Sequence, residues 1–136
     1  MENKYKIPES IINILNKKNK KSKEIILYEN DNFILAIDVK NTKEIFHYTA
    51  WYKHVMPTIE YANFMVLQHI VDLKNELLEK NIIKENTKCF VHYPPSIYQL
   101  HVHFTDPKHI DERPDNEILN IKQIEKYLNY KYLSKL

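Results

Sequence analysis

The sequence predicts an α+β domain, an antiparallel β-sheet flanked by helices. Segments rich in aliphatic and aromatic residues, typical of β-strands, recur at 25–28, 33–37, 46–52, 88–93 and 98–105. Between the third and fourth segments, apolar residues follow helical spacing. A second helical pattern follows Pro114. We expect residues 1–136 to form one domain, with its core in 24–136.

The first 23 residues predict a short helix and a linker. Helical spacing over residues 7–15 places Ile11, Ile12 and Leu15 on one face, and Pro8 is tolerated in the first turn. The lysine-rich run 17–23 follows. Such a run is typical of a solvated linker, and a phosphate-attracting patch is the alternative.

The strand segments are joined by turns that contain no glycine, because the chain has none. Asn and Asp at 30–32 predict the first turn, and Pro94 and Pro95 interrupt the sheet before the last strand. The absence of glycine excludes glycine-rich phosphate loops and dinucleotide fingerprints. Phosphate binding would therefore depend on side chains and ordinary main-chain amides.

Two amphipathic helices are predicted. The first runs from about Thr58 to Lys80, and its apolar positions are Ile59, Ala62, Val66, Ile70, Leu73 and Leu77. Glu76 and Lys80 form a predicted surface pair on this helix. The second has Pro114 in its first turn and carries Ile118, Ile121, Ile124, Leu128 and Tyr132.

Composition narrows the class of protein. Hydrophobic residues make up 43% and charged residues 28% of the chain, as expected for a soluble globular domain. No apolar run approaches the roughly 20 residues of a membrane span. The net charge of +2 argues against binding to long nucleic acid. The single cysteine, Cys89, excludes an internal disulfide, and no signal peptide is evident, so we expect a cytoplasmic protein.

The segment from Gln99 to Thr105 alternates strictly. Leu100, Val102 and Phe104 point to one face, whereas Gln99, His101, His103 and Thr105 point to the other. The first set is expected to enter the core, and the second to display a row of polar groups. The Pro94–Pro95 turn would bring the preceding strand back beside this row and add His92 to it.

Three interpretations of the histidines compete. The row can be an ordinary polar surface. It can be a metal site, since histidines two apart on a strand ligate zinc or iron, with His109 and Glu112 as the nearby candidates for further ligands. It can also be a catalytic site, because a neutral imidazole is a competent nucleophile toward phosphorus. A second, protonated histidine would then stabilise the negative charge that builds on the phosphate oxygens.

The sequence resembles a known superfamily here. Residues 99–105 resemble the histidine triad motif, His-φ-His-φ-His-φ-φ, with glutamine in place of the first histidine. The longer run 92–105 resembles the scavenger mRNA decapping enzymes, which have a histidine, a proline-serine and an aromatic residue at the same offsets. Residues 24–30 and 38–40 resemble a strand and an Asp-x-Lys cap-contacting element of that branch. The similarity runs from about Glu24 to Phe104 and is expected to continue into the last helix, and it implies the histidine triad fold.

The resemblance also implies roles for the histidine row. His101 would be the nucleophile that takes the phosphoryl group, and His103 would contact the phosphates from the same face. His92 would hold or protonate the polyphosphate from the neighbouring strand. Gln99 occupies the leading position of the triad, where glutamine keeps hydrogen bonds but carries no charge.

Further substrate contacts follow from the same resemblance. Ser96 would contact a phosphate at the turn, and Asp38 and Lys40 would touch the cap or its phosphates. Arg113, in the Glu112-Arg113 pair, resembles a basic residue beyond the triad. About 23 residues precede the similar region, fewer than the N-terminal domain of the full-length enzymes needs, so we expect that lid to be missing.

Other residues are assigned mainly structural roles. His69 lies among helical core positions, and Trp51 is expected in the core, with stacking on a base as the alternative. Cys89 is expected to be packed rather than reactive. No role is assigned to His47, His54 or His109.

The expected activity is hydrolysis of a 7-methylguanosine cap dinucleotide or cap nucleotide through a nucleotidyl-histidine intermediate, by a homodimer and without a cofactor. One alternative is a histidine triad hydrolase of dinucleoside polyphosphates or nucleoside phosphoramidates. The other is a cap- or nucleotide-binding module with impaired catalysis, for which the glutamine at position 99 would be the sign.

Overall fold

The computed structural model describes residues 25–134, with side chains described for 25–130. The predicted helix over 7–15 and the lysine-rich run 17–23 lie outside these residues, as does the side chain of Tyr132.

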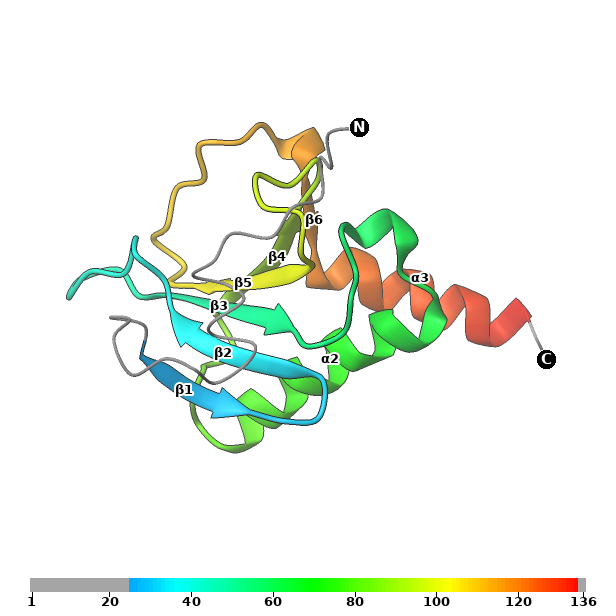
Figure 1. The fold of residues 1–136 in the computed structure, drawn as a ribbon, viewed down its shortest axis with the longest axis horizontal. Helices are drawn as coiled ribbons and strands as arrows, with labels where there is room; N and C mark the ends of the chain where they lie inside the picture. Colours follow the sequence, from blue (N-terminus) through cyan, green and yellow to red (C-terminus); the bar gives the residue numbers. More distant parts are fainter. Residues whose placement is uncertain (1–24, 135–136) are drawn as a thin grey trace.

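Six strands form one antiparallel sheet in the order β1-β2-β3-β5-β4-β6, which confirms the predicted α+β class (Figure 1). The strands are β1 (Ile26–Glu29), β2 (Phe33–Ile37), β3 (His47–Tyr52), β4 (Lys88–His92), β5 (His101–Thr105) and β6 (Ile118–Asn120). The first five coincide with the predicted strand segments, and their ends differ from the predicted ends by at most a few residues. β6 was expected to be helical.

The hairpin between β1 and β2 is closed by an asparagine. The Asn30 side-chain oxygen accepts hydrogen bonds from the main-chain N–H groups of Asn32 and Phe33, both at 2.8 Å. This is how asparagine replaces a glycine turn, because its side chain pairs with the main chain locally. The predicted Asn-Asp turn is confirmed.

The first long helix starts later than predicted. A 3₁₀ turn, η1 (Ile59–Tyr61), comes first, and α2 spans Phe64–Glu79. Asn63 is the N-cap, since its side-chain oxygen accepts from Val66 N at 3.0 Å. The helical spacing of Ile59 and Ala62 therefore reflects the 3₁₀ turn rather than a continuous helix.

The C-terminal segment contains a strand where a helix was predicted. A 3₁₀ turn, η2 (Asp115–Glu117), is followed by β6 and then by α3 (Ile121–Ser134). Asn120 and Gln123 form a reciprocal cap, in which each main-chain N–H donates to the other's side-chain oxygen, at 2.8 and 3.0 Å. This capping box starts the helix at residue 121 and leaves Ile118 free to pair with His92.

Both helices cover one face of the sheet (Figure 1). The core between them takes alternate strand residues, including Leu100, Val102 and Phe104, as the alternation predicted. The opposite face carries the other alternate residues of β3, β4 and β5. That second face holds the histidines.

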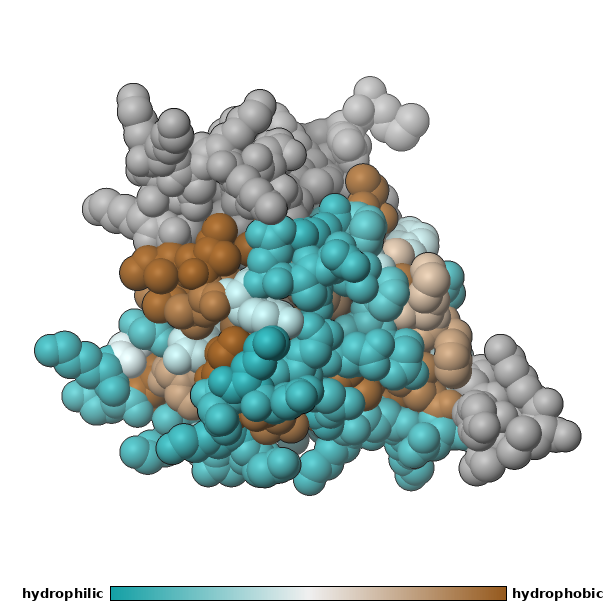
Figure 2. Space-filling model, turned by 90° about the horizontal axis from the view of Figure 1, so that it is seen from below, coloured by the Kyte–Doolittle hydropathy of each residue, from teal (hydrophilic) through white to brown (hydrophobic). Residues whose placement is uncertain are grey.

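The surface seen from below in Figure 2 is mostly hydrophilic, with hydrophobic side chains gathered at one side. Ile25, Ile26 and Leu27, in and beside the edge strand β1, are exposed aliphatic residues. Among the described residues, neither α2 nor α3 has the length and apolarity needed to cross a membrane.

Candidate active site

Strand pairing gathers the histidines. β3 and β4 flank β5 in antiparallel register, with Trp51 opposite His101, and Thr49 and Phe90 on either side of His103. The reversal at the proline turn is confirmed. It places the His92 ring 4.9 Å from the ring of His103.

The polar row of β5 is buried rather than displayed, which corrects the sequence prediction. His101 is 7% exposed, His103 is 8% exposed, and Gln99 and Thr105 are almost wholly buried. The rings pack together, because Phe90 stacks on His103 with 5.2 Å between centroids. Alternation identified the two faces of the strand, but it did not reveal that aromatic residues of neighbouring strands fill the second face.

His101 has a defined tautomer. Its Nδ1 lies 2.7 Å from the main-chain oxygen of Gln99. A carbonyl oxygen only accepts hydrogen bonds, so the proton must be on Nδ1. Burial lowers the pKa of His101 below its ordinary value, against the opposing effect of the Gln99 hydrogen bond. The ring is therefore neutral near pH 7, and Nε2 carries a free lone pair.

The Gln99 side chain serves the fold. Its amide nitrogen donates to the main-chain oxygens of Tyr52 and His54, at 2.7 and 2.8 Å. These bonds tie the approach to β5 to the end of β3. The residue thus contributes its main-chain oxygen to the site and its side chain to the scaffold.

Trp51 lies on the histidine face. Its ring is 4.5 Å from that of His101 with an interplanar angle of 32°, and the side chain is 6% exposed. Trp51 is buried, as expected, but it is not part of the core beneath the helices. The tryptophan packs directly on the candidate nucleophile.

His103 is hydrogen-bonded to His47, a residue to which sequence reasoning gave no role. His47 Nε2 and His103 Nδ1 are 2.9 Å apart, and both rings are buried. Burial lowers the pKa of both histidines, that of His103 strongly. The sequence feature that could have pointed to His47 is its alternation with Thr49 and Trp51, which places the three side chains on one face of the strand. Pairing of this strand with β5 was not deducible from the sequence.

Asp38 and Lys40 lie beside this pair. Asp38 accepts hydrogen bonds from the Thr49 hydroxyl at 2.7 Å and from Lys40 N at 2.9 Å. The Lys40 side chain is exposed, yet its charge contributes to the lowered pKa of His47 and His103. Both predicted cap-contacting residues therefore border the histidine cluster.

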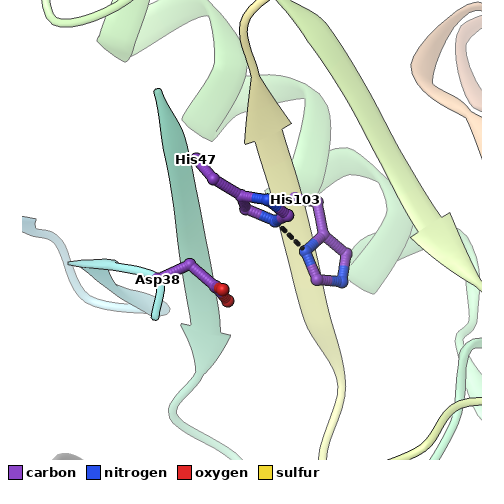
Figure 3. A group of neighbouring side chains, drawn as sticks. All are labelled: Asp38, His47 and His103. Atoms are coloured by element: carbon purple, nitrogen blue, oxygen red, sulfur yellow. Dashed lines mark hydrogen bonds between the residues drawn. The ribbon is translucent and has the colours of Figure 1, made fainter. Parts of the chain in front are cut away.

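Asp38, His47 and His103 each offer a potential metal-ligand atom, and these atoms lie within 4.8 Å of one another (Figure 3). This set differs from the one considered from the sequence, which used His109 and Glu112. In the structure, the facing nitrogens of the two histidines share a hydrogen bond, and Thr49 pairs with Asp38.

His92 is paired with an aspartate that sequence reasoning missed. His92 Nε2 lies 2.7 Å from Asp111 Oδ2, and the two side chains are 13% and 14% exposed. His109 Nε2 is 3.9 Å from the same oxygen, and its ring lies 5.0 Å from that of His47. The loop after β5 therefore contributes to the site.

Ser96 lies in the turn between β4 and β5, and Arg113, in the loop after β5, contacts that turn. Ser96 is exposed. Arg113 Nη1 donates to the main-chain oxygen of Pro94 at 2.6 Å and to Glu117 at 3.0 Å. The guanidinium charge also contributes to the lowered pKa of His101. The structure thus brings His92, His101, His103 and Arg113 into one neighbourhood.

Two other residues match their structural assignments. Cys89 is buried beneath the helices, and burial raises the pKa of its thiol. His69 is half-buried, and its Nδ1 lies 2.9 Å from the Tyr52 hydroxyl.

Comparisons with known proteins agree with this arrangement. The family model described as "Scavenger mRNA decapping enzyme C-term binding" matches residues 10–117, beginning before the region recognised from the sequence. Among curated proteins, none matches.

Solved structures show the same fold. A histidine triad family hydrolase from Clostridium thermocellum is 18% identical, with a TM-score of 0.57 over 78% of this chain and 94% of that one. A hypothetical histidine triad nucleotide-binding protein from Sulfolobus tokodaii is 15% identical, with a TM-score of 0.54 over 88% of this chain and 87% of that one. An aprataxin ortholog in complex with DNA is 17% identical, with a TM-score of 0.52 over 81% and 69%. The chain therefore has the histidine triad fold and belongs to the family of the C-terminal binding region of scavenger mRNA decapping enzymes.

Proposed function

We propose that this protein is a histidine triad hydrolase of nucleoside polyphosphates, with His101 as its nucleophile. The observation that carries the proposal is the 2.7 Å hydrogen bond from His101 Nδ1 to the Gln99 main-chain oxygen. It leaves Nε2 of a neutral ring unprotonated, which is the form that attacks phosphorus.

The reaction proceeds in two displacements. His101 Nε2 forms a bond to the phosphorus of the nucleoside-bound phosphate, and the P–O bond to the departing phosphate chain breaks. Water then attacks the same phosphorus, the P–N bond breaks, and a nucleoside monophosphate leaves. His101 returns to its neutral form, and the water's proton goes to solvent.

Neighbouring groups stabilise the developing charge on the phosphate oxygens. His103 donates from Nε2 when the proton it shares with His47 lies on the His47 side. His92 and Arg113 supply further donors, and Ser96 contacts a phosphate at the turn. Asp38 and Lys40 bind the cap or its phosphates beside His103.

The substrate within this class is a 7-methylguanosine cap dinucleotide or cap nucleotide. The family match over residues 10–117 supports this assignment. Incubation with a methylated cap dinucleotide should release 7-methylguanosine monophosphate. Equal rates on methylated and unmethylated dinucleotides would instead favour a general dinucleoside polyphosphate hydrolase.

The alternative to an enzyme is a cap- or nucleotide-binding module with impaired catalysis. It is suggested by Gln99, which replaces the first histidine of the triad. The structure weakens that inference, since the Gln99 side chain is engaged with Tyr52 and His54. Calorimetry beside the activity assay separates the two. A module would bind the cap analogue without releasing product.

The working form is a cytoplasmic homodimer in this proposal. Dimerisation rests on the resemblance to histidine triad proteins, and cytoplasmic location on the single buried cysteine, Cys89. Light scattering of the purified protein measures its mass directly. A measured mass equal to that of one chain, at the protein concentration of the activity assay, would contradict dimerisation.

A further inference from the structure

The loop after β5 places one carboxylate against His92. Asp111 Oδ2 accepts from His92 Nε2 at 2.7 Å, and both side chains are largely buried. Asp111 has no part in the roles assigned above. Its geometry is that of a carboxylate orienting a histidine.

Both oxygens of Asp111 are engaged. Oδ1 accepts from the main-chain N–H of Arg113 at 2.8 Å, while Oδ2 accepts from His92. Burial alone would raise the pKa of Asp111, but these two hydrogen bonds together with the charges of His92 and His109 outweigh it, and the pKa falls below its ordinary value. The group is therefore an ionised acceptor at neutral pH. Its partner proton must lie on His92 Nε2.

The loop is anchored on both sides of Asp111. Asp106 N donates to Phe46 O at 3.0 Å, and Lys88 Nζ donates to His109 O at 2.7 Å. On the other side, the Arg113 guanidinium holds Pro94 O. The carboxylate is thus fixed relative to β3, β4 and the proline turn, so it can fix His92 in turn.

Asp111 interacts electrostatically with His92, as do His101 and His103 on β5 and His109 in the loop. A positive charge on His92 is opposed by a positive charge on any of these histidines and is favoured by the Asp111 carboxylate.

We propose that Asp111 is a positioning residue that acts through His92. It holds the Nε2 proton, so that the proton that His92 takes up when phosphate binds lies on Nδ1 and is donated to the phosphate oxygens, and the Asp111 charge stabilises this doubly protonated ring. The role rests on the proposed polyphosphate hydrolysis, and it deepens that proposal by assigning the orientation of His92 to the loop.

Asp111→Asn is the informative variant because it is nearly isosteric. Arg113 N requires an acceptor, so the amide oxygen takes that position and the amide NH₂ faces His92 Nε2. His92 must then accept, and its proton moves to Nδ1. Nitrogen-15 NMR of the imidazoles reads this tautomer directly. We expect Nε2–H in the wild type and Nδ1–H in Asp111→Asn.

Asp106→Asn is the matched control. Asp106 accepts from the main-chain N–H two residues later, Lys108, at 2.9 Å, as Asp111 does from Arg113. It has no histidine partner in the described hydrogen bonds. Asp106→Asn should leave the His92 tautomer unchanged.

Affinity for inorganic pyrophosphate is the second readout. Asp111→Asn should weaken binding by about tenfold, because a neutral His92 then donates an ordinary hydrogen bond to pyrophosphate where the wild-type ring donates a charge-assisted one. In a His92→Gln background, Asp111→Asn should cause no further loss of pyrophosphate affinity, because Asp111 acts only through His92 and the two effects are therefore not additive. Thermal unfolding checks that each variant is folded.

An Nδ1–H tautomer of His92 in the wild type would overturn the proposal without any variant. So would an unchanged tautomer in folded Asp111→Asn, or equal weakening of pyrophosphate binding by Asp106→Asn. A wild-type protein that hydrolyses no cap dinucleotide would contradict the proposed function instead. The tautomer and pyrophosphate results would still decide the role of Asp111.

Discussion

His101 donates its Nδ1 proton to the main-chain oxygen of Gln99, two residues earlier in the chain. The tautomer of the candidate nucleophile is therefore set by the backbone. Any residue at position 99 supplies that oxygen, provided that β5 starts in the same place. The absence of the first triad histidine therefore does not remove the hydrogen bond that sets the His101 tautomer.

Gln99 is predicted to matter for stability more than for chemistry. Gln99→Leu leaves the buried main-chain oxygen of Tyr52 and the part-buried one of His54 without the Gln99 donor, so the free energy of unfolding should fall by about 2–4 kcal/mol. Urea unfolding measures this loss. Gln68→Leu is the control, since within residues 25–130 the Gln68 side chain makes one exposed hydrogen bond, to Asp72 on α2, and the substitution should change stability by less than about 0.5 kcal/mol.

Gln99→His restores the triad motif and should not raise turnover. Neutral histidine has one N–H donor, so one of the two carbonyl bonds is lost while the main-chain oxygen still holds His101. Turnover of a methylated cap dinucleotide by folded protein is the measurement. A large gain in kcat would show that the first triad position acts through its side chain.

The stability of the protein is predicted to fall on mild acidification. Burial lowers the pKa of His47, His101, His103 and His109 in the folded state. Below about pH 6.5 the unfolded chain binds protons that the folded protein does not, so unfolding becomes more favourable. Urea midpoints should decrease from pH 7.5 to pH 5. A double variant, His47→Phe with His103→Phe, should show a smaller decrease, and a flat profile in the wild type would contradict the burial.

His47 is predicted to support His103. His47→Phe preserves a ring in the buried site but leaves His103 Nδ1 without its partner, which should cost about 1–3 kcal/mol of stability. Thermal and urea unfolding report this cost. His54→Phe is the control, because His54 is exposed and bonds to Asn32 at 3.1 Å. If His47→Phe and His54→Phe lower the free energy of unfolding equally, the His47–His103 hydrogen bond does not contribute to stability as predicted.

The only tryptophan of the chain, Trp51, should report on His101. Its ring packs against His101 in a tilted arrangement with 4.5 Å between centroids, so a charge or a phosphorus placed on that imidazole lies close to the indole. We expect fluorescence to change when a cap analogue binds. The change should be strongly reduced in His101→Ala. An equal response in that variant would place the ligand elsewhere.

The sequence was sufficient for the fold class and for the two faces of β5, because alternation and helical spacing are local properties. It misplaced the start of the last helix because the Asn120–Gln123 capping box competes with Pro114 as a start signal. Pro114 lies six residues earlier and precedes only a 3₁₀ turn.

Only the site residues that lie close together in the sequence were predictable. His92, His101 and His103 follow from one continuous motif and one turn. His47 and Asp111 reach the same cluster through strand pairing and a loop, and neither contact leaves a local pattern. The burial of the row also depends on Phe90 and Trp51 from neighbouring strands.

A covalent adduct on His101 tests the central claim most directly. Protein mixed with a methylated cap dinucleotide is quenched in alkali, where a phosphorus–nitrogen bond survives, and its peptides are analysed by mass spectrometry. A nucleotidyl group should appear on His101 in the wild type and in the exposed-site control His54→Ala. It should be absent, with turnover abolished, in His101→Ala. Undiminished turnover in His101→Ala, or rapid release of monophosphate with no adduct on His101, would contradict the account.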